Sequence, residues 1–206
     1  MTAVNVSARE LGFDVEQFES LISRVKTPYI SSNIVDSKTG IPRFKTHFLL
    51  EHHEKKIAII GVTEKVIKTW ELSDGTTIVT SDPIKSVKPI VEKVRDETDM
   101  VILLAHMPRH KLIPLIEAVP VIDLVLAGDG YSLTREPLKV GNTFVSYAGK
   151  QGQYLGSIKV KFTDNGPELV DNKMVLLTPD MPEDPKVKAM VDEALAKIEA
   201  LKADDE

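Results

Sequence analysis

The sequence predicts an α/β protein, a layered sandwich with mixed strand directions in which strands outnumber helices. Three apolar runs, 57–62, 100–105 and 122–127, are long enough to cross a buried sheet. Amphipathic helical patterns lie between the apolar runs, as expected when parallel strands alternate with helices that cover a sheet. A late segment, 156–177, alternates apolar and polar residues around a turn. This alternation predicts a hairpin with one solvated face.

The first third of the chain predicts one helix and three strands. Asp14, with Gln17 three residues later, forms a capping box that begins a helix, and Thr27-Pro28 ends it. Turn residues at 36–40 separate the first strand from the next. The strands are expected at 29–35, 44–53 and 56–63.

The remainder predicts alternating strands and helices. Asp82-Pro83 is a helix start, with proline at the first helical position, and Pro89 inside that helix predicts a kink. A last helix begins at Asp184-Pro185. Between these two helices we expect a strand ending at His106, a short helix near 111–119, a strand ending at Gly128, a strand at 143–148 and the hairpin.

Composition excludes several classes of protein. The net charge is −5 and no stretch concentrates Lys or Arg, which argues against a nucleic-acid polymer as partner. The absence of cysteine excludes disulfides, thiolate metal sites and cysteine nucleophiles. No run reaches the ~18 apolar residues of a membrane span. Residues 1–14 lack a basic segment followed by an apolar one, so no signal peptide is expected here.

Two strands end on residues that can bind a metal. The run 100–105 is followed by His106, and the run 122–127 by Gly128-Asp129. In α/β proteins, chemistry gathers at the carboxyl ends of strands. This position is therefore where a site is expected.

Several segments resemble one family when read in order. They are 31–40, 56–63, the Asp-Pro helix, the strand ending at His106, 121–128, and Ala-Gly-Lys-Gln-Gly-Gln-Tyr-Leu-Gly at 148–156. Together they resemble the calcineurin-like metallophosphoesterases of the 5′-nucleotidase and UDP-sugar hydrolase type. The resemblance implies a four-layer α/β/β/α sandwich that holds two divalent metals. It makes 1–180 a partial catalytic domain with mixed sheets, and 181–206 a linker-type helix.

The resemblance also assigns candidate metal ligands. The family's first two ligand loops have no counterpart in this chain. Its third loop, Gly-Asn-His-Glu-Phe-Asp, corresponds to residues 9–14 of this sequence. There, Glu10 replaces the metal-binding Asn and Leu11 replaces the catalytic His. His106 matches the fourth loop, and Asp129 replaces a ligand His of the fifth. Glu10, His106 and Asp129 together would suit a single Mn²⁺, Fe²⁺ or Zn²⁺. The other interpretation is a decayed site without metal, in which His106 bonds to backbone and Asp129 caps a turn.

Two functions remain open at this point. The first is a metal-dependent phosphate ester hydrolase, acting on a nucleotide or related small ester and impaired in this chain. No catalytic residue is assigned; Arg109 and His110 are the candidates for binding the substrate anion, against a plain surface role. The second is a non-catalytic module that binds a partner or a small anion. Loss of the first strands predicts an exposed sheet edge and a homodimer, or an N-terminal segment rearranged to cover that edge. The family implies an extracytoplasmic location.

Overall fold

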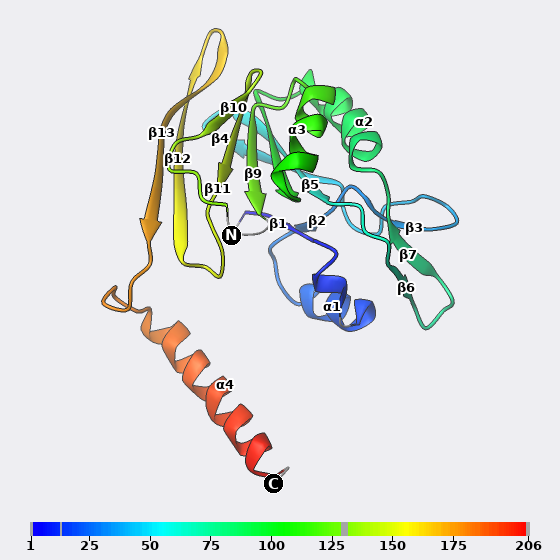
Figure 1. Ribbon diagram of the computed structural model, residues 1–206, viewed down its shortest axis with the longest axis vertical. Helices are drawn as coiled ribbons and strands as arrows, with labels where there is room; N and C mark the ends of the chain where they lie inside the picture. The colour runs from blue at the N-terminus through cyan, green and yellow to red at the C-terminus, as the bar shows by residue number, and fades with distance from the viewer. Residues whose placement is uncertain (1, 13, 129–131, 205–206) are drawn as a thin grey trace. The chain divides into compact units, whose positions relative to one another are not determined.

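The computed structural model describes residues 2–12, 14–128 and 132–204 (Figure 1). The chain divides into two compact units, Met1–Val175 and Leu176–Glu206. The first unit carries all the sheets, and the second carries the helix α4 (Pro185–Asp204). Each unit is described here by itself.

A six-stranded sheet forms the centre of the first unit. Its order is β10-β11-β9-β8-β5-β4. The four inner strands run parallel, while β4 and β10 pair antiparallel at the two edges, so the sheet is mixed as the sequence predicts. The strands are β4 (His47–His52), β5 (Lys55–Thr63), β8 (Met100–His106), β9 (Leu124–Gly128), β10 (Leu138–Val140) and β11 (Thr143–Tyr147).

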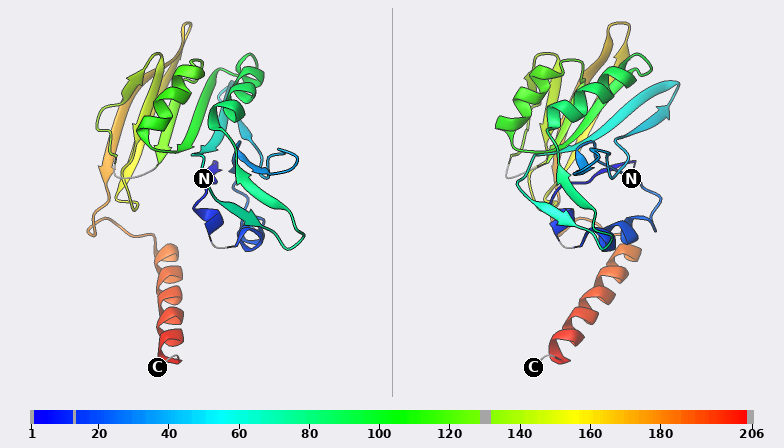
Figure 2. Two further views of the ribbon diagram at one scale, coloured as in Figure 1. Left: turned by 45° about the vertical axis from the view of Figure 1, so that its right-hand side comes forward. Right: turned by 90° about the vertical axis from the view of Figure 1, so that its right-hand side faces the viewer.

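Two helices, α2 (Pro83–Arg95) and α3 (Arg109–Ala118), cover one face of this sheet (Figures 1 and 2). The Asp82 side chain accepts a hydrogen bond from the Lys85 amide at 2.9 Å, which confirms the predicted cap of α2. Alternate residues of the inner strands point toward the helices. Val101, Leu103 and Ala105 of β8 are therefore buried in the main core.

The opposite face of the sheet is covered in part by the predicted hairpin, β12 (Tyr154–Thr163) and β13 (Gly166–Leu176). The Asn172 side chain of β13 accepts a hydrogen bond from Ser146 Oγ of β11 at 3.1 Å. Its amide nitrogen donates to Arg135 O at 3.2 Å. Helices, central sheet and hairpin are the α/β/β part of the predicted four-layer arrangement.

The N-terminal part and a small sheet lie at the carboxyl ends of the central strands. The strand β1 (Val4–Asn5) pairs parallel with β2 (Tyr29–Ile30). A second, smaller apolar core includes Val6, Leu11, Trp70 and Ile78. The remaining elements of this region are the 3₁₀ turn η1 (Glu10–Gly12), α1 (Val15–Ile22), and the sheet of β3 (Ile34–Asp36), β7 (Thr77–Thr80) and β6 (Thr69–Glu71).

One strand that the sequence predicts as continuous is broken in the structure. The expected strand 29–35 divides into β2 and β3, which belong to different sheets. The break occurs because the buried Asn33 side chain bonds to the backbone of Thr63, accepting from its N–H at 2.9 Å and donating to its carbonyl at 2.8 Å. The β6–β7 hairpin was not predicted either, since its strands are only three and four residues long.

In the second unit, α4 begins at Pro185 as expected, after Asp184 accepts hydrogen bonds from the Lys186 and Val187 amides. Its apolar stripe, which includes Val187, Val191 and Ile198, is exposed. None of the helices that the structure describes is both long enough and apolar enough to span a membrane.

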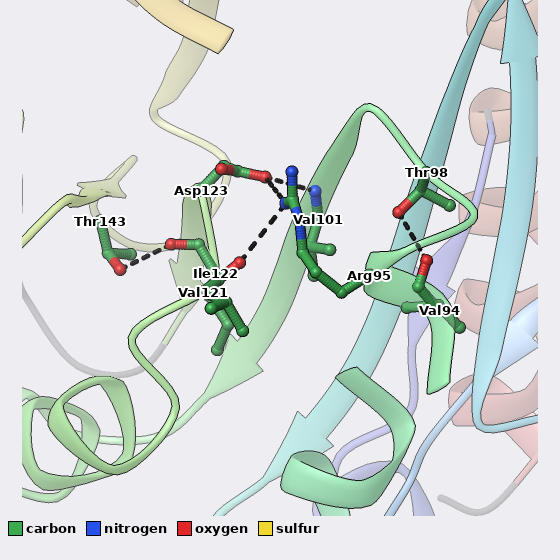
Figure 3. Close-up of polar contacts among 8 residues, drawn as sticks. All are labelled: Val94, Arg95, Thr98, Val101, Val121, Ile122, Asp123 and Thr143. Atoms are coloured by element: carbon green, nitrogen blue, oxygen red, sulfur yellow. Dashed lines mark hydrogen bonds and ion pairs between the residues drawn. The ribbon is translucent and has the colours of Figure 1, made fainter. Parts of the chain in front are cut away.

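Partly buried hydrogen bonds join the amino ends of β8 and β9 to the end of α2 (Figure 3). Asp123 Oδ2 accepts hydrogen bonds from Arg95 Nη1 at 2.6 Å and from the Val101 amide at 2.7 Å. Thr143 Oγ1 donates to Ile122 O at 2.6 Å, which joins β11 to the same corner. These bonds fix the position of the start of β9 relative to its neighbouring strands β8 and β11.

Asp123→Ala should lower the free energy of unfolding by about 2–3 kcal/mol, because a charged acceptor for two donors is lost. The measurement is urea unfolding followed by circular dichroism. Glu117→Ala, at an exposed position of α3, is the control and should change stability by less than ~0.5 kcal/mol. Equal stability of the Asp123 variant and the parent would contradict this assignment.

Gly61→Ala should destabilise the first unit by about 1–3 kcal/mol through overpacking. A Cβ at Gly61 would lie 2.6 Å from both Asn5 Oδ1 and Ile30 O, since β1 and β2 cross close above β5. The matched control is Gly128→Ala, where a Cβ meets nothing within 4 Å. Both variants are compared by thermal unfolding, and a similar midpoint for the two would show that β1 does not hold this close approach.

Stability should depend on the ionisation of His47. Burial, aided by the charge of Lys93, lowers the pKa of this histidine from 6.5. The unfolded chain therefore takes up the proton at a higher pH than the folded one. The contribution of neutral His47 to the free energy of unfolding is thus complete above pH 6.5 and is lost as the pH falls below it. The stability difference between the parent and His47→Asn should stay constant from pH 8 to 7 and shift against the parent toward pH 5.5.

Candidate functional site

The candidate site lies at the carboxyl ends of β8 and β9. His106 is the last residue of β8, and in the parallel register it stands beside Thr63 of β5 and Gly128 of β9. The carbonyl oxygen of His106 accepts a hydrogen bond from the Glu64 amide at 2.9 Å. This backbone hydrogen bond thus fixes the position from which the His106 side chain extends. That position is at the carboxyl ends of the strands, where the sequence predicts a site.

The N-terminal segment brings Glu10 to the same place. Val6 N donates to Ile30 O, and Asn5 Nδ2 donates to Val62 O, both at 2.9 Å, which fixes the segment against β2 and β5. Glu10 opens the 3₁₀ turn that follows. Its Oε2 accepts hydrogen bonds from the Ser7 amide and the Ser7 hydroxyl. The bond from the Ser7 amide to Glu10 is one half of a capping box, while the Ser7 hydroxyl accepts a hydrogen bond from the Arg9 amide at 3.2 Å.

Glu10 and His106 line one small pocket of about 170 Å³. Its described lining holds one carboxylate and one imidazole, and no Lys or Arg. The other lining residues are Asn5, Ser7, Leu104, Ala105, Leu126 and Gly128. With this lining, the pocket favours a cation over an anion.

His106, which lines this pocket, has an unsatisfied ring nitrogen. Its Nδ1 is buried and has no hydrogen-bond partner within the described residues. A buried polar atom without a partner is uncommon and calls for an explanation such as a bound ion or water. The backbone hydrogen bond expected of a merely structural strand-end histidine is therefore not made by this nitrogen.

The donor chemistry fits a divalent cation in part. An imidazole nitrogen and a carboxylate are two of the ligand types that Mn²⁺, Fe²⁺ and Zn²⁺ accept. Asp129, the third sequence-predicted ligand, lies outside the described residues. Within the ranges described, no three His, Cys, Asp or Glu side chains gather closely enough to hold an ion.

The two predicted substrate-binding residues lie elsewhere. Arg109 and His110 are exposed in the first turn of α3, and neither lines the pocket. The neighbouring Lys111 reaches back to Glu64 in a 2.7 Å ion pair, which holds α3 to the end of β5. Their role in binding a substrate anion stays a prediction.

Leu11 is part of the protein core. Its side chain is fully buried in the smaller apolar cluster with Val6, Val15 and Trp70. It can neither donate nor accept a proton there. The position that the resemblance sets against the catalytic histidine therefore serves packing in this chain.

Sequence reasoning missed the polar residues that support the pocket. Asn33 and Thr63 are fully buried and joined by two hydrogen bonds, and Ser7 is 3% exposed. The Ser7-x-x-Glu10 spacing is a recognisable capping signal that would have placed the Glu10 side chain. The hydroxyls of Ser31 and Ser32 are buried without a partner in the described part of the chain, and their sequence carries no signal of this.

Comparisons with known proteins give a consistent picture, although no family model matches the chain. The trifunctional nucleotide phosphoesterase YfkN of Bacillus subtilis is 27% identical over 197 residues, covering 92% of this chain and 13% of that protein. The human 5′-nucleotidase is 26% identical over 232 residues, covering 97% of this chain and 40% of that protein. This chain therefore spans less than half of either relative.

A solved structure, that of the calcineurin-like phosphoesterase YfkN from Bacillus subtilis, matches with a TM-score of 0.77 and 16% identity. The match covers 95% of this chain and 70% of the solved one. The relatives found by sequence and by fold thus carry the names of the family that the sequence segments resemble. The chain is a divergent relative of the calcineurin-like metallophosphoesterases of the 5′-nucleotidase type and shares their fold.

Proposed function

We propose that this chain is part of a phosphoesterase that acts on a nucleotide or a similar small phosphate ester and depends on a divalent metal. The observation that supports the proposal is the meeting of Glu10 and His106 in one pocket. Glu10 lies in the N-terminal 3₁₀ turn and His106 at the end of β8, and the pocket lies at the carboxyl ends of the parallel strands β8 and β9. The relatives named above act on nucleotides, so this substrate class is inferred from them.

In this proposal Glu10, His106 and Asp129 hold a single ion of Mn²⁺, Fe²⁺ or Zn²⁺. Such an ion, when bound, supplies Lewis-acid polarisation of a phosphoryl oxygen. The Ser7 amide and hydroxyl orient the Glu10 carboxylate, in the way that outer partners orient metal ligands. The hydrogen bond from the Glu64 amide to the His106 carbonyl fixes the backbone position from which the imidazole extends.

We infer that hydrolysis by this chain alone is impaired. The described lining of the pocket contains no cationic group to neutralise a phosphate and no acid for a leaving oxygen other than the two proposed ligands. Leu11 is enclosed in the core and supplies neither. Arg109 and His110 would have to approach the substrate from the exposed start of α3.

The alternative function is a non-catalytic module that binds a partner or a small anion. It is favoured by the size of the pocket, since about 170 Å³ is well below the ~300–1,000 Å³ of ordinary small-molecule sites. A nucleotide would extend out of it. The two functions differ in whether a phosphate ester is turned over.

Two further proposals follow from the family and the sheet. The central sheet ends in β4 and β10, which have no outer partner strand within the described residues. Edges of this kind promote self-association, so we propose a homodimer through one of them.

We also propose an extracytoplasmic location, by analogy with the family.

Calorimetric titration with Mn²⁺ and with Zn²⁺ tests the metal site. The parent should bind one ion, His106→Ala should abolish the heat of binding, and Glu10→Gln should weaken binding by about tenfold or more. His52→Ala, at an exposed histidine of β4, is the matched control and should bind like the parent.

The possible results separate the alternatives. If neither ion binds the parent, the metal-dependent function is wrong for this chain. If an ion binds and p-nitrophenyl phosphate is hydrolysed by the parent but not by His106→Ala, the chain is active and the inference of impaired hydrolysis is wrong. If an ion binds without turnover of this ester or of AMP, the non-catalytic module is supported.

A further inference from the structure

The turn between β12 and β13 contains the only Asn-Gly pair in the sequence. Residues 163–166 read Thr-Asp-Asn-Gly, and the turn joins the two strands at one end of the hairpin (Figure 1). Gly166 has a φ angle of +106°, in the region that favours glycine. A Cβ at Gly166 would meet nothing within 4 Å, so the described elements leave space beside its backbone.

The Asn165 side chain can rotate toward the Gly166 backbone. Asn165 is exposed, and its side-chain amide has no hydrogen-bond partner within the described residues. Its backbone amide donates to Thr163 Oγ1 at 3.3 Å, and the same hydroxyl donates to Gly166 O at 3.0 Å. The Thr163 hydroxyl therefore holds the backbone on both sides of the 165–166 peptide bond, while the Asn165 side chain stays unrestrained.

Asn142 provides a comparison within the same molecule. It is also exposed, and it lies in the turn between β10 and β11. The next residue, Thr143, is fully buried, β-branched and bonded through its hydroxyl to Ile122 O. A branched side chain crowds its own backbone nitrogen, and a buried strand residue cannot rotate its backbone freely. The two asparagines are thus equally exposed, but the backbone nitrogen that follows them is accessible only at Gly166.

We propose that Asn165 is a site of spontaneous modification, at which the Gly166 backbone nitrogen converts the side-chain amide to a carboxylate. The nitrogen loses its proton to hydroxide and bonds to Asn165 Cγ. The bond from Cγ to the side-chain nitrogen then breaks, and that nitrogen leaves as ammonia. Water opens the resulting five-membered succinimide at either carbonyl, which leaves aspartate or isoaspartate at position 165. The reaction uses one turn of the first unit and is independent of the metal site.

The product changes the hairpin in two ways. Each conversion adds a negative charge next to Asp164, and like charges on neighbouring residues of a hairpin repel. In the isoaspartate form, the main chain runs through the side-chain carbon, so one additional atom separates the two backbone groups that Thr163 binds. We therefore expect the Thr163 hydrogen bonds to be lost and the turn to loosen.

Peptide mapping by mass spectrometry of the full chain, incubated at mildly alkaline pH, tests the modification. A synthetic peptide of residues 161–169 with blocked ends gives the rate without the fold. We expect Asn165 in the folded chain to convert no more than about a hundredfold more slowly than in the peptide, because an exposed turn opens at little cost in free energy. Aspartate and isoaspartate should both form and carry heavy oxygen from labelled water, whereas Asn142 should stay intact.

Variants of the full chain provide the controls. Asn165→Gln should remain unmodified, because its longer side chain would have to close a six-membered ring. Asn142→Gln is the matched control, and its Asn165 should convert at the parent's rate. Asn165→Asp carries the added charge without the additional chain atom. Amide hydrogen exchange in β12 should therefore be faster in the aged parent than in this variant.

Either of two results would overturn this assignment. The first is an intact Asn165 in the folded chain after about a hundred half-times of the peptide reaction, which would show that the turn holds the side chain away from the nitrogen. The second is conversion to aspartate without any isoaspartate. Water would then attack the side-chain amide directly, and the Gly166 nitrogen would have no part in the reaction.

Discussion

The hydrogen bonds between the Asn33 side chain and the Thr63 backbone hold the two parts of the first unit in register. Asn33 is fully buried, and its amide both accepts from and donates to Thr63 while also donating to Ser81 O at 3.1 Å. Thr63 is the last residue of β5 and stands beside His106 in the sheet. Because one side chain satisfies three backbone groups, the chain between β2 and β3 is fixed against the carboxyl end of β5. Val6, in the segment that carries Glu10, donates a hydrogen bond to Ile30 of β2, so the position of Glu10 relative to His106 depends in part on this junction.

The sequence could predict the parts of the fold that obey a regular period. The apolar runs of β5, β8 and β9, the Asp-Pro start of α2 and the alternation in β12 and β13 each contain their own signal. The short strands β1, β6, β7 and β10 do not, because two to four residues cannot show a period. The division of the expected strand 29–35 depends on Asn33 meeting Thr63, a contact between residues 30 positions apart that no local pattern encodes.

The candidate site was predictable to a similar degree. Strand ends and the family resemblance indicated His106 and Glu10, and the structure places both beside one pocket. The spacing of Ser7 and Glu10 carries a signal for the bond between them, whereas the burial of Leu11 depends on how the N-terminal segment packs and could not be foreseen. Arg109 and His110 are exposed on α3. The site thus combines His106, whose position is set by a regular strand, with Glu10, whose position is set by the path of the short N-terminal segment.

The enclosure of Leu11 affects how a chain of this kind can change over generations. A histidine placed there would be surrounded by Val6, Val15 and Trp70 and would lose its contact with water. The folding penalty would come at once, whereas any gain in chemistry would require the residue to move out of the cluster. The gain of a proton-transferring side chain at this position therefore cannot start with the histidine itself. It would have to start with changes among the apolar neighbours that open a path for the side chain, and these changes confer no catalytic benefit of their own.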